Sequence, residues 1–398
     1  MANNNENKVL NVPHLRFPEF NGEWETKLIN DLAVVIGGGT PDTTIKSYWD
    51  GEIQWFTPSE IGKNKYVDSS LRTITEEGLN NSSAKLLPPN TILLSSRATI
   101  GECSLSLREC ATNQGFQSLV SKKCYVDFLY YLIQTKKRDL IRKSCGSTFL
   151  EISANEVRKI QVSVPTDVEQ QKIAGLLSLI DERIATQNKI IEDLKKLKSA
   201  IIEKHYRQAE KQTVCIADLG EHFSVGNLAK DDLSETGTPC ILYGELFTTY
   251  GETISQIESR TNKTGGMVLS KKGDLLFPSS TTVDAVSLIA PSVINIDNVV
   301  LGGDMFGIHI NSNFDAQYLS YFFNHIAKRR LAKYAKGSTI IHLHYADIEK
   351  AKLLLPCLKE QHRMAKCLVS LDDKINVETL SLNLLNNQKT YLLRHMFI

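Results

Sequence analysis

Two long stretches of the chain carry apolar residues at heptad spacing and contain neither glycine nor proline. They cover residues 176–208 and residues 358 onward. Pro165 precedes the first stretch, followed by the capping residue Asp167, and Pro356 has the same place before the second. The spacing predicts two helices of about 35 to 40 residues, each about 50 to 60 Å long.

An apolar stripe on so long a helix must be buried against another element. We expect the two helices to pair as an antiparallel intramolecular coiled coil about a pseudo-two-fold axis, because two copies of one unit commonly pair in that way. Such a pair would be a rigid spacer with one globular part at each end. The predicted helix-pair core consists of Ile173, Leu177, Ile180, Ile184, Ile191, Leu194, Leu368, Leu371, Ile375, Leu382 and Leu385.

The remaining segments have short apolar runs that indicate β-rich domains with some helix. The predicted strands are 34–36, 53–56, 91–94, 275–277, 283–289 and 307–310. Each globular part then ends in a basic amphipathic helix, Asp127 to Lys143 in the first and Asp315 to Lys336 in the second. The expected fold class is α+β, with two β-rich α/β domains joined by the two long helices.

An internal repeat relates the two halves at an offset of 191 residues. Gly146-Ser147-Thr148 recurs as Gly337-Ser338-Thr339, and the offset gives 11 identities over residues 146–184, where chance gives about two or three. Upstream, Tyr130-Tyr131-Leu132 matches Tyr321-Phe322-Phe323 at the same offset, and still further upstream the offset falls to 187 and 183. Shifting offsets imply small insertions in loops. The predicted segments are a tail at 1–21, domains at 22–165 and 212–356, and helical spacers at 166–211 and 357–398.

Composition restricts the class of protein. The chain is 42% hydrophobic and 23% charged, which is ordinary for a globular protein, and 46 basic residues against 45 acidic ones leave a net charge of +1. The eight cysteines form no C-x-x-C pair, which favours buried or free thiols in a reducing compartment over a metal site or a disulfide framework. With a polar N-terminus and no apolar run of membrane-spanning length, we expect a cytoplasmic protein without membrane contact.

No pattern of catalytic residues is present. The chain lacks the phosphate-binding G-x-x-x-x-G-K-[ST] sequence, and Gly37–Gly39 is more typical of a turn than of a phosphate site. His342 and His344 alternate, but the first copy has Glu151 and Ser153 there, which favours a structural role. We therefore predict neither a catalytic residue nor a metal site.

Basic clusters before each Gly-Ser-Thr turn are the better functional candidates. Lysine and arginine beside hydroxyls and backbone amides suit phosphate oxygens, although a basic helix face is often merely solvated. The candidate phosphate contacts are Lys136, Lys137, Arg138, Arg142, Lys143, Ser147 and Thr148, then Lys328, Arg329, Arg330, Lys333, Lys336, Ser338 and Thr339. Polar loop residues could meet base edges, namely Ser95, Ser96, Arg97, Asn113 and Gln114, then Ser279, Ser280, Thr281 and Thr282.

At these residues the chain resembles the specificity subunits of type I restriction–modification enzymes. The resemblance rests on G-S-T, K-I-x-V-x-V-P and E-Q-Q-K-I-A-x-L-L-S-x-I-D-x-R-I over residues 146–184, with a more degenerate copy at 337–375. Residues 96–101 and 113–116 are similar to the family's target-recognition domains.

The resemblance implies a non-catalytic protein that binds double-stranded DNA. Each domain would read one half of a bipartite asymmetric site, while the helices set the gap and bind two modification subunits. S-adenosylmethionine would belong to these methyltransferase partners, and ATP and magnesium to two further restriction subunits. Two alternatives stay open: a self-contained enzyme with duplicated domains, against which the missing methyltransferase motifs argue, and a structural coiled-coil adaptor.

Overall fold

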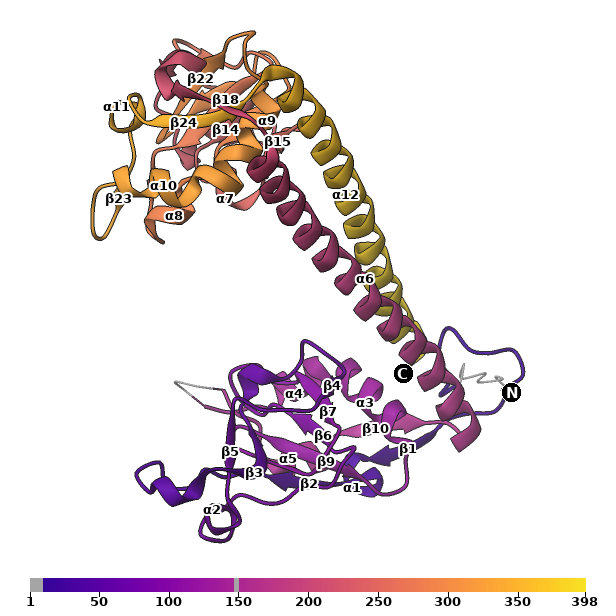
Figure 1. The fold of residues 1–398 in the computed structure, drawn as a ribbon. Coiled ribbons are helices and arrows are strands. Elements are labelled where there is room, and N and C mark those ends of the chain that lie inside the picture. Colours follow the sequence, from indigo (N-terminus) through magenta and orange to yellow (C-terminus); the bar gives the residue numbers. More distant parts are fainter. Residues whose placement is uncertain (1–9, 147–149) are drawn as a thin grey trace, which may run out of the picture. The chain divides into compact units, whose positions relative to one another are not determined.

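The computed structural model describes residues 10–146 and 150–398 (Figure 1). The chain forms two compact units: unit 1 comprises Met1–Lys189 with Thr379–Ile398, and unit 2 comprises Ile190–Glu378. Each predicted long helix contributes one part to each unit. The candidate residues Ser147 and Thr148 lie outside the described residues.

Unit 1 is built on two sheets. Its strands are β1 (Glu25–Leu28), β2 (Ala33–Gly37), β3 (Trp49–Phe56), β4 (Tyr66–Val67), β5 (Arg72–Ile74), β6 (Ile92–Leu94), β7 (Cys103–Ser106), β8 (Cys110–Thr112), β9 (Gln117–Ser121) and β10 (Gln161–Val164). Five form a sheet in the order β2-β9-β6-β7-β4, three form another in the order β5-β3-β8, and β1 pairs with β10. The helices of its globular part are α1 (Ile29–Leu32), α2 (Glu76–Asn80), α3 (Val126–Thr135), α4 (Lys137–Arg142) and α5 (Ala154–Arg158).

Unit 2 repeats this plan, but its second sheet has five strands where that of unit 1 has three. Its strands are β11 (Lys211–Cys215), β12 (Gly220–Ser224), β13 (Leu233–Ser234), β14 (Thr238–Leu242), β15 (Thr253–Ile254), β16 (Arg260–Thr261), β17 (Val268–Leu269), β18 (Asp274–Pro278), β19 (Ser280–Thr281), β20 (Ser292–Ile294), β21 (Val300–Gly302), β22 (Met305–Ile310), β23 (Ile341–His342) and β24 (Lys352–Pro356). Its sheets run β12-β22-β18-β20-β15 and β13-β16-β14-β21-β17, with pairs β11-β24 and β19-β23. Its helices are α7 (Glu245–Thr248), α8 (Ala285–Leu288), α9 (Ala316–Phe322), α10 (Lys328–Leu331) and α11 (Tyr345–Ile348).

The two long helices are α6 (Asp167–Gln208) and α12 (Leu358–His395). Within unit 1, the first part of α6 lies beside the last part of α12, where Lys389 Nζ is 2.7 Å from Asp181 Oδ1. Within unit 2, Lys198 Nζ of α6 is 2.6 Å from Asp372 Oδ1 of α12. Of the predicted helix-pair core, Ile173, Leu177, Ile180, Ile191, Leu368, Ile375 and Leu385 are buried, and Ile184, Leu194, Leu371 and Leu382 are half-buried. The start of each helix also packs into the adjoining globular core, as Leu177 and Leu368 do.

Most predicted strands are present, but the strand predicted at residues 283–289 is wrong. This segment folds as α8 because the Asp284 side chain accepts a 2.8 Å hydrogen bond from Ser287 N and caps a helix. Each predicted basic helix is also interrupted, the first between α3 and α4 at Lys136 and the second by a π-helical turn at Phe323–Ala327.

The π-helical turn corrects the alignment of the repeat. A π-helical turn accommodates one extra residue within a helix. Before it the two units correspond at an offset of 190, since Tyr131 and Tyr321 each bind an aspartate of a long helix. After it the offset is 191. The structural counterpart of Tyr321 is therefore Tyr131 and not Tyr130.

Segments near both ends of the described chain contribute residues to the core of unit 1. Leu15 N donates a 2.8 Å hydrogen bond to His395 O. The rings of Trp24 and Phe397 meet edge to face at 6.5 Å, and Phe128 of α3 stacks on Phe397 at 5.2 Å. Unit 1 is thus closed by contacts between sequence-distant segments.

Candidate functional site

In unit 1, the turn after β6 meets the antiparallel pair Cys145 and Glu151, here called the hairpin, between which residues 147–149 lie outside the described part of the chain. Cys145 and Glu151 exchange backbone hydrogen bonds of 2.9 and 3.0 Å, which define the two sides of this hairpin. Arg97 of the turn bridges to Glu151, and Ile152 N donates to Ser96 O at 2.9 Å. The chain enters the hairpin directly from basic α4, so turn, hairpin and basic helix adjoin.

Unit 2 reproduces the same three-part arrangement. Lys336 and His342 exchange backbone hydrogen bonds of 2.9 and 2.7 Å, and Leu343 N donates to Ser279 O at 2.9 Å. Ser280 of the turn after β18 pairs with His342 in the β19-β23 ladder. The chain enters this hairpin from α10. The sequence-predicted polar and basic candidates are therefore brought together once in each unit.

The four serines predicted to contact base edges are buried, which argues against direct contact of their side chains with DNA. Ser95 and Ser96 are 0% exposed, and Ser279 and Ser280 are 4% and 5% exposed. They close the turn that follows a central strand, where the Ser95 hydroxyl donates to Arg97 O at 2.8 Å. Of the other candidates, Arg97, Asn113 and Thr281 are half-buried, and Gln114, Ser338 and Thr339 are exposed.

A hollow of about 860 Å³ lies in unit 2 beside its hairpin. Ser280, Thr281 and Lys328 line it together with His342 and Asp304. The carboxylate of Asp304 lies 3.9 Å from His342 Nδ1. Asp304 was not a candidate from the sequence, because a lone aspartate carries no distinguishing pattern.

The basic candidates differ in how far neighbouring carboxylates already neutralise them. Lys137 pairs with Glu102, Arg142 with Asp139, Lys143 with Glu156 and Lys336 with Asp347. The hydrogen bond from Lys336 is the main reason that the pKa of Asp347 is lowered. By contrast, four exposed candidates form no ion pair with any described residue, namely Arg138, Arg329, Arg330 and Lys333. These four retain the most charge for an anionic partner.

Each long helix is joined to its globular part by an equivalent glutamine. Gln170 Nε2 donates to Pro165 O at 2.9 Å, while its Oε1 accepts from Tyr125 N at 2.9 Å. Gln361 Nε2 donates to Pro356 O at 2.8 Å, and its Oε1 accepts from Asp315 N at 3.0 Å. The repeat had marked these glutamines as identities without indicating their role.

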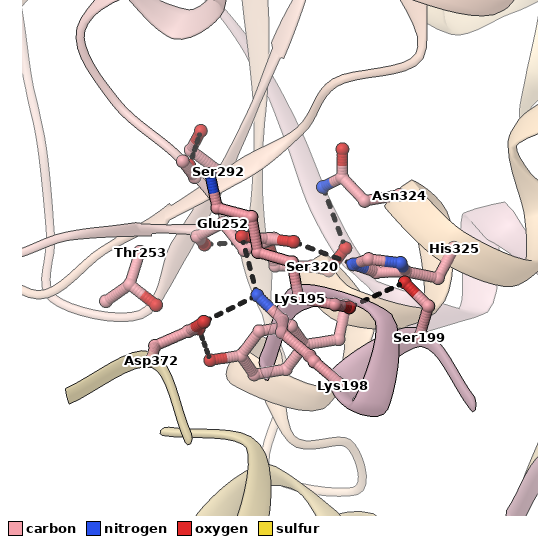
Figure 2. A network of polar contacts seen from close by, with 12 residues as sticks. Lys195, Lys198, Ser199, Glu252, Thr253, Ser292, Ser320, Asn324, His325 and Asp372 are labelled. Carbon is pink, nitrogen blue, oxygen red and sulfur yellow. Dashed lines mark hydrogen bonds and ion pairs between the residues drawn. The ribbon is translucent and has the colours of Figure 1, made fainter. Parts of the chain in front are cut away.

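A second junction in unit 2 is a buried polar network. Figure 2 shows Lys198 between Asp372 and Glu252, with its Nζ 3.1 Å from Glu252 Oε2. His325, in the π-helical turn, contacts the other oxygen of Glu252 at 2.7 Å. The Tyr321 hydroxyl donates to Asp372 at 2.5 Å. Helix α6, helix α12 and the globular part of unit 2 are thereby connected at one point.

The charges of this network determine its protonation. Burial by itself raises the pKa of the Glu252 carboxyl, but the hydrogen bond with His325 and the charge of Lys198 outweigh it and hold the pKa at about 2. Burial, followed by the hydrogen bond to Asp372, raises the pKa of the Tyr321 hydroxyl. Glu252 is therefore an ionised partner of Lys198 across the physiological pH range.

Histidines and cysteines do not converge on a metal site within residues 10–146 and 150–398, where no group of three or more suitable side chains occurs. In that same part of the chain, none of the helices combines the length and apolarity required to cross a membrane.

Known proteins share this duplicated arrangement. The family model described as the type I restriction modification DNA specificity domain matches residues 21–196 and 208–387. The chain belongs to this family. The two matches to the specificity domain correspond to the two copies of the repeat, which explains why turn, hairpin and basic helix occur twice.

Individual type I specificity subunits are similar to different extents. The MjaIX subunit of Methanocaldococcus jannaschii is 39% identical over 180 residues, which are 44% of this chain and 42% of that relative. This match thus spans less than half of the curated subunit. The MjaVIII subunit of the same organism is 23% identical over 391 residues, or 92% of this chain and 89% of that one. The crystal structure of an S subunit from M. genitalium shares the fold, with a TM-score of 0.61, 16% identity and coverage of 97% of this chain and 99% of that chain.

Proposed function

We propose that this chain is the DNA sequence-specificity subunit of a type I restriction–modification complex, with unit 1 and unit 2 each binding one half of a bipartite asymmetric site. One observation carries the proposal: turn, hairpin and basic helix recur in both units, while the side chains presented there differ. Arg97 in unit 1 corresponds to Ser280 in unit 2, and Glu151 to His342. Shared backbone with different side chains suits two copies of one reader that recognise different bases.

The long helices would form the antiparallel intramolecular coiled coil that fixes the number of unread base pairs. They would also dock two methyltransferase subunits. Support comes from unit 1, where Leu179, Leu380, Leu384 and Tyr391 are 56–62% exposed on the helices. A groove of about 580 Å³, lined by Leu179 and Leu385 among others, lies between α6 and α12 there.

The chemistry would belong to the partners. S-adenosylmethionine would bind the two modification subunits, and ATP and magnesium the two restriction subunits, so this chain would contribute recognition alone. The complete complex would work in the cytoplasm.

The test begins with the chain co-expressed with its modification subunit in a bacterium that lacks other adenine methyltransferases. Mapping N6-methyladenine across the host DNA should give one motif with two specified halves and a gap of constant length. Purified complex should then bind that site more tightly than a site whose gap is one base pair longer. Methylation by this chain alone would instead support a self-contained enzyme, and equal binding to both gap lengths would contradict the rigid spacer.

A further inference from the structure

The turn that carries Arg97 is held rigidly in place. Thr99 N donates to Arg97 O at 2.7 Å, and the Ser95 hydroxyl donates to the same oxygen at 2.8 Å. Ala98 has φ of 59°, in the left-handed region that non-glycine residues rarely adopt. A residue in this conformation persists only where its surroundings enforce it, and such positions concentrate at binding sites.

The side chains of Arg97 and Asn113 both lie beside Gly115. A Cβ atom placed on Gly115 would lie 2.9 Å from Pro58 Cγ, 3.0 Å from Asn113 Oδ1 and 3.4 Å from Arg97 Nε. Glycine at this position therefore leaves room for both side chains. Although Arg97 faces Glu151 across a β-bridge, its guanidinium has no ion pair or side-chain hydrogen bond within the described residues.

The polar atoms left over in this cluster of Arg97, Asn113 and Gln114 are donors. Asn113 Oδ1 accepts from Gly115 N at 2.8 Å, and Gln114 Oε1 accepts from the Thr40 hydroxyl at 2.5 Å. Each amide therefore has its NH₂ group available, beside the five N–H groups of the Arg97 guanidinium. In the DNA major groove, guanine alone presents two adjacent acceptors, N7 and O6, and arginine is their commonest partner.

Unit 2 has the opposite chemistry at the equivalent place. Ser96 N donates to Gly115 O at 2.8 Å, as Ser279 N donates to Asp304 O at 2.7 Å, so Asp304 stands where unit 1 has Gly115. The arginine position is occupied by buried Ser280. Unit 1 thus has the large Arg97 beside the small Gly115, whereas unit 2 has the small Ser280 beside the larger Asp304. The half-exposed carboxylate of Asp304 offers hydrogen-bond acceptors only.

We propose that Arg97, assisted by Asn113, reads a guanine in the half-site of unit 1, and that Asp304 reads a base with a major-groove amino group, cytosine or adenine, in the half-site of unit 2. This proposal rests on the proposed function. The donor cluster selects acceptors, whereas the Asp304 carboxylate selects the N4 amino group of cytosine or the N6 amino group of adenine.

The experiment maps N6-methyladenine in host DNA for the full chain co-expressed with its modification subunit, then for R97Q, R97K and D304N. In R97Q, discrimination at one guanine should weaken by about 10- to 100-fold, with the other half-site unchanged. R97K should weaken discrimination at this guanine to a smaller extent, since lysine keeps the positive charge but lacks the planar set of N–H donors that can bind N7 and O6 together. D304N should relax a single cytosine or adenine position in the other half-site.

R108Q is the matched control, because Arg108 belongs to the same unit but pairs with Asp68 at 2.6 Å and is 55% exposed. Its motif should equal that of the parent chain. An unchanged unit 2 half-site in R97Q shows that this variant is folded and assembled. If the parent chain gives a two-part motif that R97Q leaves intact, Arg97 does not read a base. If the parent chain gives no two-part motif, the proposed function itself fails.

Discussion

The Tyr131 hydroxyl donates a 2.6 Å hydrogen bond to the Asp181 carboxylate, joining helix α3 to helix α6 within unit 1. Lys389 of α12 pairs with the same aspartate. In unit 2, Tyr321, Asp372 and Lys198 make the same set of contacts, with the two long helices exchanging roles. A Tyr–Asp–Lys group therefore anchors each globular part to both helices.

Removing one phenol tests this anchor. We expect Tyr131→Phe to lower the free energy of unfolding of unit 1 by about 1.5 to 3 kcal/mol, because it takes a hydrogen bond from a charged, partly buried carboxylate. Urea unfolding measures the change. Tyr391→Phe, at a side chain that is 56% exposed, should change stability by less than about 0.5 kcal/mol. Equal effects of the two substitutions would argue against the anchor.

Lys198, at the junction of α6, α12 and the globular part of unit 2, should contribute more to the free energy of unfolding than a surface lysine does. Lys198→Met leaves Glu252 and Asp372 without their shared cation, and we expect a loss of about 3 to 5 kcal/mol. Lys196, exposed and paired with Glu192 on the same helix, is the control, and Lys196→Met should cost at most about 0.5 kcal/mol. Denaturant unfolding of both variants compares them, and a Lys198 variant as stable as the control would refute the role of the network.

The lowered pKa of Glu252 predicts a pH dependence. Its pKa is about 2 in the folded chain against an ordinary 4.5, so its ionised form stabilises unit 2 above pH 4.5, and this contribution is lost as the pH falls from 4.5 to 2. The stability advantage over Glu252→Gln should therefore shrink by about 3 kcal/mol across that window. Thermal unfolding from pH 7 to pH 2 measures it. A constant difference between the two proteins would show that Glu252 is not the group responsible.

The unpaired and paired cations should differ in their effect on DNA binding. Arg138→Gln should weaken binding of the assembled complex to all sequences and reduce the slope of log K against log salt by about 1. Lys137→Gln, one residue away, removes a charge that Glu102 already neutralises and should have a smaller effect. A salt titration of binding to a duplex of the mapped site makes the comparison. Indistinguishable slopes for Arg138→Gln and the parent chain would show that Arg138 does not contact a phosphate.

Much of the fold could be predicted because its signals are local. Heptad spacing and the absence of glycine and proline predicted α6 and α12, and alternating or apolar runs predicted β2, β3, β6, β18 and β22. The strand predicted at residues 283–289 was wrong because the β-branched residues there favour a strand, whereas one capping hydrogen bond from Ser287 N to Asp284 stabilises a helix. A count of residue types does not detect such a bond.

The site was predictable only in part, because its geometry depends on pairing between distant segments. Arg97, Asn113 and Gln114 were candidates as polar loop residues. Nothing in the sequence indicated that the side chains of Arg97 and Asn113 would both lie against Gly115. Asp304 became relevant only through its backbone equivalence with Gly115. The prediction that the serines contact bases was wrong because a hydroxyl that can bind a base edge can equally form a hydrogen bond within a turn, as that of Ser95 does.

The contacts of Trp24 and Leu15 with Phe397 and His395 bear on the order in which the molecule is completed during synthesis. The core of unit 1 includes Leu392, Met396 and Phe397, so the unit that contains the earlier segment of the sequence stays incomplete until Phe397 has been synthesised. Unit 2 is a single continuous segment, Ile190–Glu378, and can close earlier. The domain nearer the N-terminus is thus the later one to mature, contrary to the usual order of domain folding on the ribosome.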